Sequence, residues 1–518
     1  MRGRPADPNA TLRRPPAPVP PPPSTAPAPA AAAPAQRPAA TPTRHGPARP
    51  RTVGARELPQ ALVSEADAQF IKQRVSQRLA EERKTNPGMS RSDREQRCLG
   101  WINDEVAMWY GRQAAQRGAP PSGEEEMALA RYVFDLLFRA GRLQPLLDDT
   151  RFENIHINRY DQVWGDLGSG ELVRLPPVAS SDEELRELLQ ELARNTSHGQ
   201  QEKIFSPEAK PELSLRLDDG SRVQAFTGVT PYTCVNIRKH RHRDISLDDL
   251  VELGTVDTSL RDFLRAAIHA EKNLMISGKA GSGKTTLLRA LMREYDPDER
   301  IATLETEYEL FAHESGHARQ IIALEGREAT GESTADGRAA GEYTLQDLIA
   351  PSLRMGTQRT VVGEVRGAEI IAMMQALTSG EGGSLSTIHC RSAYGVFDRI
   401  AELYALAREN LSEKLAYRQI RNGLDFIVHV EMINERRSGG GRHRFVSHVL
   451  EITGGENEDG KPATNTVFGP APDTGEVRAV PLMGPACLLD LLRAGMPETA
   501  LDQATWQRPL PLKWGGVR

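Results

Sequence analysis

Residues 271–289 read EKNLMISGKAGSGKTTLLR, and this stretch decides the fold of the chain around it. An apolar run at 274–276 leads into the spacing G-x-x-x-x-G-K-T, and a leucine-rich helical pattern follows at once. Glycines in such a loop let backbone N–H groups face phosphate oxygens at the positive end of the next helix. The stretch therefore predicts a phosphate-binding loop between a strand and a helix. Its residues are Gly278, Lys279, Ala280, Gly281, Ser282, Gly283, Lys284, Thr285 and Thr286.

Two side chains of this loop carry specific chemistry. Lys284 is placed to reach the β- and γ-phosphates of a nucleotide, and the Thr285 hydroxyl is placed to bind Mg²⁺. The loop thus predicts ATP and Mg²⁺ as ligands. A glycine-rich turn with a chance lysine is the competing interpretation, and the strand before the loop and the helix after it disfavour that one.

Composition restricts the kind of protein that this chain can be. Its 518 residues allow two or three domains, and its net charge of −5 is unevenly spread. Residues 1–56 carry about +8, so the remainder lies near −13, which argues against broad binding to nucleic acid. The four cysteines form no CxxC pair and fit a reducing compartment. No apolar run reaches the roughly 18 residues of a membrane span and no secretory signal pattern begins the chain, so we expect a cytoplasmic protein that reaches the inner face of the cell membrane through partners.

Changes in composition and periodicity divide the chain into six segments. The first holds 16 of the 36 prolines within 50 positions, so we expect a disordered tail, either passive or a docking arm for an acidic surface or anionic lipid. A helical region, an α+β domain and a short charged linker follow, and the phosphate loop begins the next domain. The expected segments are 1–57 (tail), 58–120 (helical), 121–239 (α+β), 240–246 (linker), 247–455 (α/β domain with the phosphate loop) and 456–518 (C-terminal extension without an assigned role).

Strand-like and helical stretches alternate after the phosphate loop, which predicts an α/β sheet with helices on both faces. The expected strands are Ile301–Glu305, Thr360–Val365, Leu385–His389, Phe426–Met432 and Phe445–Ile452. The stretch 360–365 is typical of a buried strand and carries Glu364 close to its end, at the sheet edge where the phosphate loop also opens. We therefore predict that Glu364 is the catalytic base or positions the attacking water. A salt bridge to Arg366 is the alternative.

Two further strand ends supply polar groups. The stretch Thr303–Glu309 carries carboxylates, and we expect Glu305 and Glu309 to hold Mg²⁺ together with Thr285 and Glu364, whereas Glu307 is more typical of a solvated residue. Residues 383–389 read GSLSTIH. The position of His389 at the end of a neighbouring strand indicates that it senses the γ-phosphate, with a purely structural histidine as the alternative.

With these blocks in this order, the sequence resembles the ATPases of type II and type IV secretion systems, and within them the CpaF-like motors of tight-adherence (Flp-type) pili. The matching blocks are the phosphate loop, RIATLE at 300–305, GEVRG at 363–367 and GSLSTIH at 383–389. N-terminal matches are LQPLL at 143–147, NIHIN at 154–158, RLDDGSRV at 216–223 and NIRK at 236–239. The resemblance extends from about residue 120 to 455.

This resemblance implies a RecA-like ATPase domain behind an α+β N-terminal domain, assembled as a homohexamer that acts on an inner-membrane platform protein. It also implies that arginines from the N-terminal domain reach the phosphates, and Arg216, Arg222 and Arg238 are the candidates. Opening and closing of the two domains around the linker would then power pilus assembly or protein secretion.

Three departures from the family pattern leave other functions open. Thr306 follows Glu305 where the family usually has aspartate, the stretch 355–359 lacks the usual Arg-Pro-Asp, and a polar insert at 325–343 is typical of a mobile loop. The alternatives are a conjugative DNA-transfer ATPase and a nucleotide-gated scaffold with little turnover. A recombinase or helicase acting directly on DNA is disfavoured, because the chain has no basic or aromatic stripe for a single strand.

Overall fold

The structure is a computed structural model that describes residues 63–117, 122–195, 204–327, 341–379, 382–407 and 411–502, together with 506, 508–510 and 512. The tail expected at 1–57 lies outside these residues, as does most of the insert expected at 325–343. Within the described ranges, no helix is long and apolar enough to cross a membrane.

The first described region consists of three helices that share one apolar core. Ser64 and Ser122 begin the first and third helices, and each serine oxygen accepts a hydrogen bond from a backbone N–H in the first turn. Ile71, Ile102 and Val133 are fully buried where the helices meet. The helices are α1 (Glu65–Thr85), α2 (Arg91–Arg117) and α3 (Gly123–Phe138).

The next region is an α+β unit around an antiparallel sheet of six described strands, in the order β3-β2-β1-β6-β5-β4. Burial alternates along its strands because one face packs on the apolar core with α5 and the other face remains accessible. Its elements are η2 (Gly141–Leu143), α4 (Gln144–Asp148), β1 (Asn154–Arg159), β2 (Gln162–Asp166), β3 (Leu172–Leu175), α5 (Asp182–Asn195), β4 (Glu212–Arg216), β5 (Arg222–Phe226) and β6 (Cys234–Arg238).

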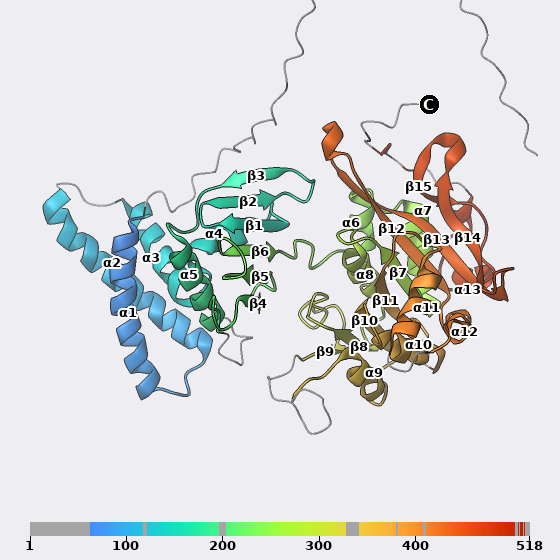
Figure 1. Cartoon of the computed structure of the whole chain (residues 1–518), viewed down its shortest axis with the longest axis horizontal. Coiled ribbons are helices and arrows are strands. Elements are labelled where there is room, and N and C mark those ends of the chain that lie inside the picture. The colour runs from blue at the N-terminus through green and yellow to red at the C-terminus, as the bar shows by residue number, and fades with distance from the viewer. Residues whose placement is uncertain are drawn as a thin grey trace, which may run out of the picture. The chain divides into compact units, whose positions relative to one another are not determined.

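The phosphate loop belongs to a larger sheet of nine described strands, in the order β15-β14-β13-β12-β7-β11-β10-β8-β9. The run from β12 to β9 is parallel, and β13, β14 and β15 pair antiparallel. The strands are β7 (Leu274–Gly278), β8 (Arg300–Glu305), β9 (Gln320–Glu325), β10 (Arg359–Val365), β11 (Leu385–His389), β12 (Phe426–Asn434), β13 (Arg442–Glu456), β14 (Pro462–Ala471) and β15 (Glu476–Pro481). Figure 1 shows the parallel strands side by side.

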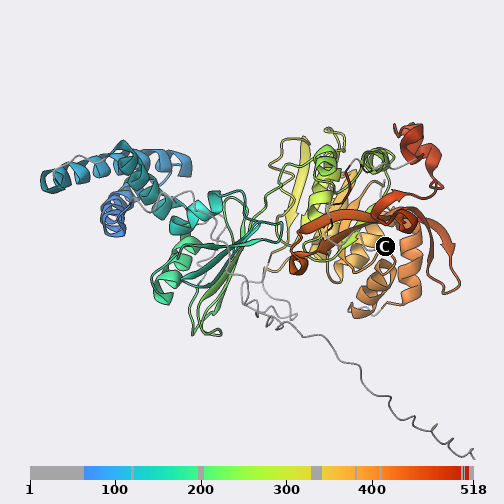
Figure 2. The same cartoon turned by 90° about the horizontal axis from the view of Figure 1, so that it is seen from above.

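Helices cover both faces of this sheet, so its central strands are buried on both sides. Ile276 of β7 packs into the core beneath α7 and α8, whereas its neighbour Met275 packs into the opposite core with α10, α11 and α12. Figure 2 shows these two groups of helices on opposite sides of the strands. The helices are α6 (Leu247–Glu252), α7 (Thr258–His269), α8 (Lys284–Met292), α9 (Leu345–Leu353), α10 (Glu369–Ser379), α11 (Val396–Leu406), α12 (Glu413–Gly423) and α13 (Leu488–Arg493). The α/β class predicted from the sequence is therefore confirmed.

The sheet continues beyond residue 455, where the sequence suggested that the α/β domain ends. Strand β13 runs to Glu456, and β14 and β15 extend the same sheet. Leu491 of α13 and Ala500 near the end of the described chain pack into the core beneath α7. The short 3₁₀ helices of this part are η3 (Arg436–Ser438), η4 (Pro472–Thr474) and η5 (Glu498–Leu501).

Candidate nucleotide site

Glycines give the phosphate loop a backbone path that other residues would resist. Gly283, at the N-cap of α8, has φ 102°, and Gly278, at the end of β7, has φ 155°. A side-chain carbon added at Gly278 would lie 2.3 Å from the Val430 carbonyl oxygen of the neighbouring strand β12. The loop therefore passes close to the sheet before it enters the helix, with its N–H groups at the N-terminal end of α8.

Four strands that carry the loop or a candidate side chain at their ends are neighbours in the sheet, because β7, β11, β10 and β8 are adjacent and parallel. Their carboxyl ends bring Gly278, His389, Glu364 and Glu305 to one edge. The pairing of β10 with β11 shifts register between Val362 and Val365, a local irregularity that includes Glu364. The edge predicted from the order of motifs in the sequence is thus present in the fold.

A chain of polar contacts joins the loop to two of these strand ends. The Lys284 Nζ lies 3.0 Å from His389 Nδ1, and His389 Nε2 lies 2.5 Å from Glu364 Oε1. Since an ammonium group only donates, Nδ1 must accept and Nε2 must carry the proton that faces Glu364. The same three residues that the sequence singled out are therefore in direct contact.

Burial and neighbouring groups set the ionisation of the residues in this series of contacts. Lys284 is 6% exposed, and burial lowers its pKa to about 8. Burial acts to raise the pKa of Glu364, but hydrogen bonds from His389 and Arg366, together with the charge of Arg366, outweigh it and lower that pKa to about 2. Glu364 is thus a carboxylate at neutral pH. The ion pair with Arg366, considered from the sequence as the alternative role, is also present, with Arg366 Nε 2.7 Å from Glu364 Oε2.

The acidic stretch after β8 curls back over the start of α8. Glu305 is 3% exposed, and its Oε2 accepts hydrogen bonds from the backbone N–H groups of Glu309 (2.7 Å) and Leu310 (2.8 Å). Burial raises the pKa of Glu305 to about 7. The Thr285 hydroxyl lies 3.4 Å from Glu309 Oε2, so two of the four expected Mg²⁺ ligands lie close together.

These oxygens can be tested as Mg²⁺ ligands. Hard cations such as Mg²⁺ prefer a few protein oxygens and several waters. Thr285 and Glu309 offer oxygens that are close together, whereas one Glu305 oxygen is used by the backbone and the other, buried, accepts no hydrogen bond within the described chain. No group of three or more His, Cys, Asp or Glu side chains suited to a metal occurs in the described ranges. The donor set fits an ion held mainly by Thr285, Glu309, water and phosphate.

The three candidate arginines form a row across the antiparallel sheet. Arg216 of β4 is directly opposite Arg222 of β5, and Arg222 is directly opposite Arg238 of β6. Like charges in directly opposite positions are destabilising unless anions face them. Here Arg216 pairs with Glu325, and Arg222 pairs with Glu309 and Glu307 at 2.7 Å each. Glu307, expected to be solvated, is one of these partners.

Two arginines near the loop were not singled out in the sequence. Arg289, 7% exposed on α8, donates hydrogen bonds to the carbonyl oxygens of Glu309 and His242. Arg444 of β13 donates to the Gly281 carbonyl oxygen at 2.7 Å and lies 3.1 Å from Glu153 Oε2. Arg289 could have been found from the sequence, because it is a cation on the apolar side of the helix that follows the loop. For Arg444 only the pairing of β13 with β12 places it near the loop.

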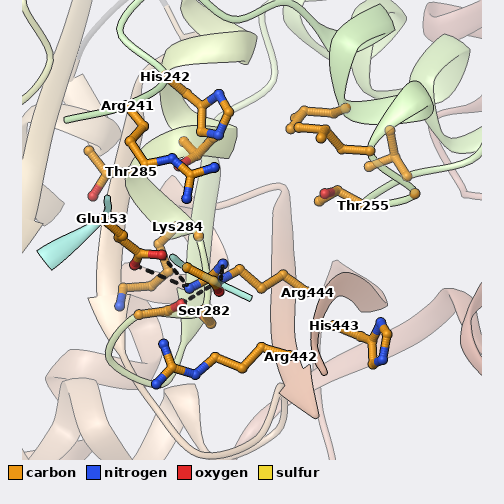
Figure 3. Close-up of a pocket in the computed structure, with 18 of the residues that line it drawn as sticks. Glu153, Arg241, His242, Thr255, Ser282, Lys284, Thr285, Arg442, His443 and Arg444 are labelled. Carbon is orange, nitrogen blue, oxygen red and sulfur yellow. Dashed lines mark hydrogen bonds and ion pairs between the residues drawn. The ribbon is translucent and has the colours of Figure 1, made fainter. Parts of the chain in front are cut away.

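A cavity of about 850 Å³ opens beside the phosphate loop. Lys284, Glu364 and His389 line it, as do Arg238, Arg442 and Arg444. Figure 3 shows Lys284, Thr285 and Ser282 with Arg444 reaching toward the loop, and Thr255 and His443 on the other side of the view. The buried Ser282 hydroxyl has no hydrogen-bond partner among the described residues. The cavity is large enough for a nucleotide and polar at its phosphate-loop end.

Comparisons with known proteins show the family to which the chain is related. The family model described as type II/IV secretion system protein matches residues 211–438. Over 326 residues the chain is 30% identical to a putative conjugal transfer protein of Mycobacterium tuberculosis, in an alignment that covers 62% of this chain and 87% of that protein. Over 339 residues it is 30% identical to the type IV secretion system protein PtlH of Bordetella pertussis, covering 60% and 94% of the two chains.

Among solved structures, the crystal structure of the VirB11 ATPase from the Brucella suis type IV secretion system, in complex with sulphate, is 25% identical. The match covers 60% of this chain and 96% of that one, with a TM-score of 0.31. The sequence relatives, aligned over most of their own length, are sufficient to assign the chain. It belongs to the type II/IV secretion system protein family.

Proposed function

We propose that this chain is an ATP-hydrolysing motor that powers pilus assembly or protein secretion. The observation that carries the proposal is the contact chain from Lys284 through His389 to Glu364 at the mouth of the phosphate loop. Hydrolysis needs a cation at the transferred phosphate and a carboxylate that orients water. The contacts through His389 join Lys284, the cation, to Glu364, the carboxylate. The chain belongs to the type II/IV secretion system family and has relatives named for conjugal transfer and type IV secretion. This supports a transport process as the one that hydrolysis powers.

In this mechanism, the loop N–H groups and Lys284 hold the β- and γ-phosphates, and Glu364 accepts a hydrogen bond from the attacking water. His389 fixes both groups, since it accepts from Lys284 and faces Glu364 with its other nitrogen. A bound Mg²⁺ would neutralise charge on the β- and γ-phosphates, with Thr285 and Glu309 as its protein ligands. The row Arg216, Arg222 and Arg238 supplies cations for the charge that develops on the γ-phosphate.

We further propose a homohexamer that engages an inner-membrane platform protein from the cytoplasmic side, as CpaF-like motors would. Size-exclusion chromatography with light scattering, with and without a non-hydrolysable ATP analogue, measures the oligomeric state. A species of six chains supports this assembly, and a monomer in both conditions contradicts it.

Steady-state ATPase activity of the purified full-length chain tests the proposed chemistry. Glu364→Gln should lower turnover on the order of 100-fold, because the amide no longer accepts the proton of the attacking water, while nucleotide binding persists. Glu402→Gln, an exposed carboxylate on α11, is the matched control and should retain wild-type turnover. Equal and negligible rates in the wild type and Glu364→Gln would instead favour the nucleotide-gated scaffold suggested by Thr306.

The conjugative alternative has one observation in its favour, since one relative is named as a putative conjugal transfer protein. Addition of single- and double-stranded DNA to the same assay tests a different alternative, the recombinase or helicase that acts directly on DNA. A motor that acts on protein or pilin should show unchanged turnover, and DNA-stimulated turnover would favour direct action on nucleic acid.

A further inference from the structure

The cavity beside the phosphate loop extends well beyond the residues that the proposed mechanism uses. Its far side is lined by the loop between α6 and α7, by His443, and by a segment near the end of the chain, Trp506 with 508–510. The family model ends at residue 438, so this last wall comes from a part of the chain outside the matched region. If the phosphates of a nucleotide occupy the loop, its ribose and base must bind elsewhere in the cavity. The far side is the part of the cavity that is left for them.

The far side has the composition of a base-binding surface. Val251, Leu253, Val256, Trp506 and Leu510 supply apolar surface there. Binding pockets for small molecules combine such apolar walls with a few polar groups that fix orientation. Two buried polar atoms of lining residues, Asp257 Oδ2 and His443 Nε2, have no hydrogen-bond partner in the described part of the chain. Buried polar atoms without partners are uncommon in folded proteins, and a ligand's hydroxyl or amino group would satisfy them.

The C-terminal segment is fastened in place by a buried arginine. Arg478 of β15 is 2% exposed, and both Glu476 carboxylate oxygens accept hydrogen bonds from it at 2.8 and 2.6 Å. Its guanidinium lies 3.9 Å from the Trp506 ring centroid and donates to the Arg508 carbonyl oxygen at 3.0 Å. The Trp506 indole N–H donates to the Ala479 carbonyl oxygen at 3.1 Å. One strand thus fixes the indole by its ring face and by its N–H, so that the wall has a defined shape.

We propose that Trp506 and residues 508–510 form the base-side wall of the nucleotide site, with Trp506 packing against the base and ribose of the bound nucleoside triphosphate. Asp257, on the same side of the cavity, is an acceptor suited to the exocyclic amino group of adenine. This inference rests on the proposed function, since it takes the ligand of the phosphate loop to be a nucleotide. It assigns a substrate-binding role to the extension that the sequence left without one.

Equilibrium binding of two ligands to the full-length chain tests this wall. ATP has a base and a ribose, whereas inorganic triphosphate has neither and reports on the phosphate loop alone. Trp506→Ala should weaken ATP binding about tenfold, the lower range for loss of one aromatic contact with a base, and should leave triphosphate binding unchanged. Trp506→Phe, which keeps an aromatic ring, should recover most of the ATP affinity.

Two matched variants separate local effects from general ones. Leu489→Ala, at an exposed residue of α13 in the same extension, should bind both ligands as the wild type does. Lys284→Ala should weaken both ligands, because it removes a cation from the phosphates. Wild-type ATP affinity in Trp506→Ala would contradict the proposed base-side wall. An equal loss of affinity for ATP and for triphosphate would also contradict it, because Trp506 would then act only through the fold. A wild-type chain that binds neither ligand overturns the proposed function itself.

Discussion

The two sheets of this chain differ in how their faces are used. In the six-stranded antiparallel sheet, buried and accessible positions alternate, as along β5 and β6. In the nine-stranded sheet, β7 is buried at every position, because helices cover both faces. The first sheet can therefore carry charged side chains along its accessible face, whereas the second can carry them mainly where its strands end.

This difference explains where the candidate chemistry is placed. The accessible face of the antiparallel sheet bears the row Arg216, Arg222 and Arg238, three cations on adjacent strands. The parallel strands bear Glu305, Glu364 and His389 at their carboxyl ends, next to the phosphate loop. One sheet thus supplies the arginines, and the other supplies the loop with Lys284 and the carboxylates. A site that needs the arginine row together with the phosphate loop and the carboxylates therefore needs residues from both sheets.

The largest expected effect tests whether the arginine row is catalytic. An arginine that stabilises charge on the γ-phosphate contributes 10³–10⁵ to turnover in related chemistry, so we expect at least one of Arg216→Ala, Arg222→Ala and Arg238→Ala to lower kcat by about 10³. Nucleotide affinity should change much less, because the contact strengthens in the transition state. Steady-state kinetics and equilibrium binding on the three variants measure both quantities. Gln224→Ala, between them in sequence on the same face of β5, is the control.

That test also has a clear contrary result. If all three alanine variants keep kcat within tenfold of the wild type, the row is not catalytic, and Arg216 and Arg222 serve only their ion pairs with Glu307, Glu309 and Glu325. The division of labour between the two sheets would then be wrong, and the parallel sheet would contain the whole catalytic site.

Paired alanine substitutions test the difference in burial directly. In β7, Met275→Ala and Ile276→Ala should each cost about 3 kcal/mol of unfolding free energy, because consecutive side chains fill two different cores. In β6, Ile237→Ala should cost a similar amount, but its exposed neighbour Asn236→Ala should change stability by less than about 0.5 kcal/mol. Urea unfolding, monitored by hydrogen exchange in peptides from each region, measures these unfolding free energies. Similar losses at Asn236 and Ile237 would show that both faces of the antiparallel sheet are packed.

Much of the parallel sheet could be predicted from the sequence because its strands are short apolar runs that end in polar residues. The stretch expected at Leu385–His389 is β11 with the same bounds, and the stretch expected at Thr360–Val365 differs from β10 by one residue. Strands β14 and β15 were not predicted. Their segments contain many polar residues and prolines, and they become strands because β14 pairs with β13 and β15 in turn pairs with β14 at the edge of the sheet.

The candidate site shows the same limit. Lys284, Glu364 and His389 follow from motifs whose spacing places Lys284 at the start of the helix after the loop and the other two near the ends of strands, and the structure brings them into contact. Trp506 and Arg444 could not be found in this way, since each approaches the cavity only through the order of strands in the folded sheet. A motif reports local geometry, whereas a wall built by a distant strand depends on the register of the whole sheet.

The smallest expected effect asks whether a buried carboxylate without a hydrogen bond always marks a functional site. Glu305 has such an oxygen beside the phosphate loop, and Asp135 has one on α3, far from it in the sequence. Asp135 is 4% exposed, its Oδ1 lies 3.6 Å from Arg139, and burial raises its pKa to about 6. Since the folded state holds the proton more tightly than the unfolded chain, the stability from this group is complete below its ordinary pKa and is lost as pH rises through 6.

Asp135→Asn should therefore raise the unfolding free energy by about 1 kcal/mol at pH 7.5 and leave it nearly unchanged at about pH 3, where the aspartate is protonated in both the folded and the unfolded chain. The gain is kept small because the amide gives up the attraction to Arg139. ATP turnover should not change, in contrast with substitutions at the strand ends. Urea unfolding at the two pH values, with ATPase assays on the same preparations, measures both. A loss of turnover in Asp135→Asn with a stable fold would mean that the helical region acts on the nucleotide site, and the two sheets together would then not account for catalysis.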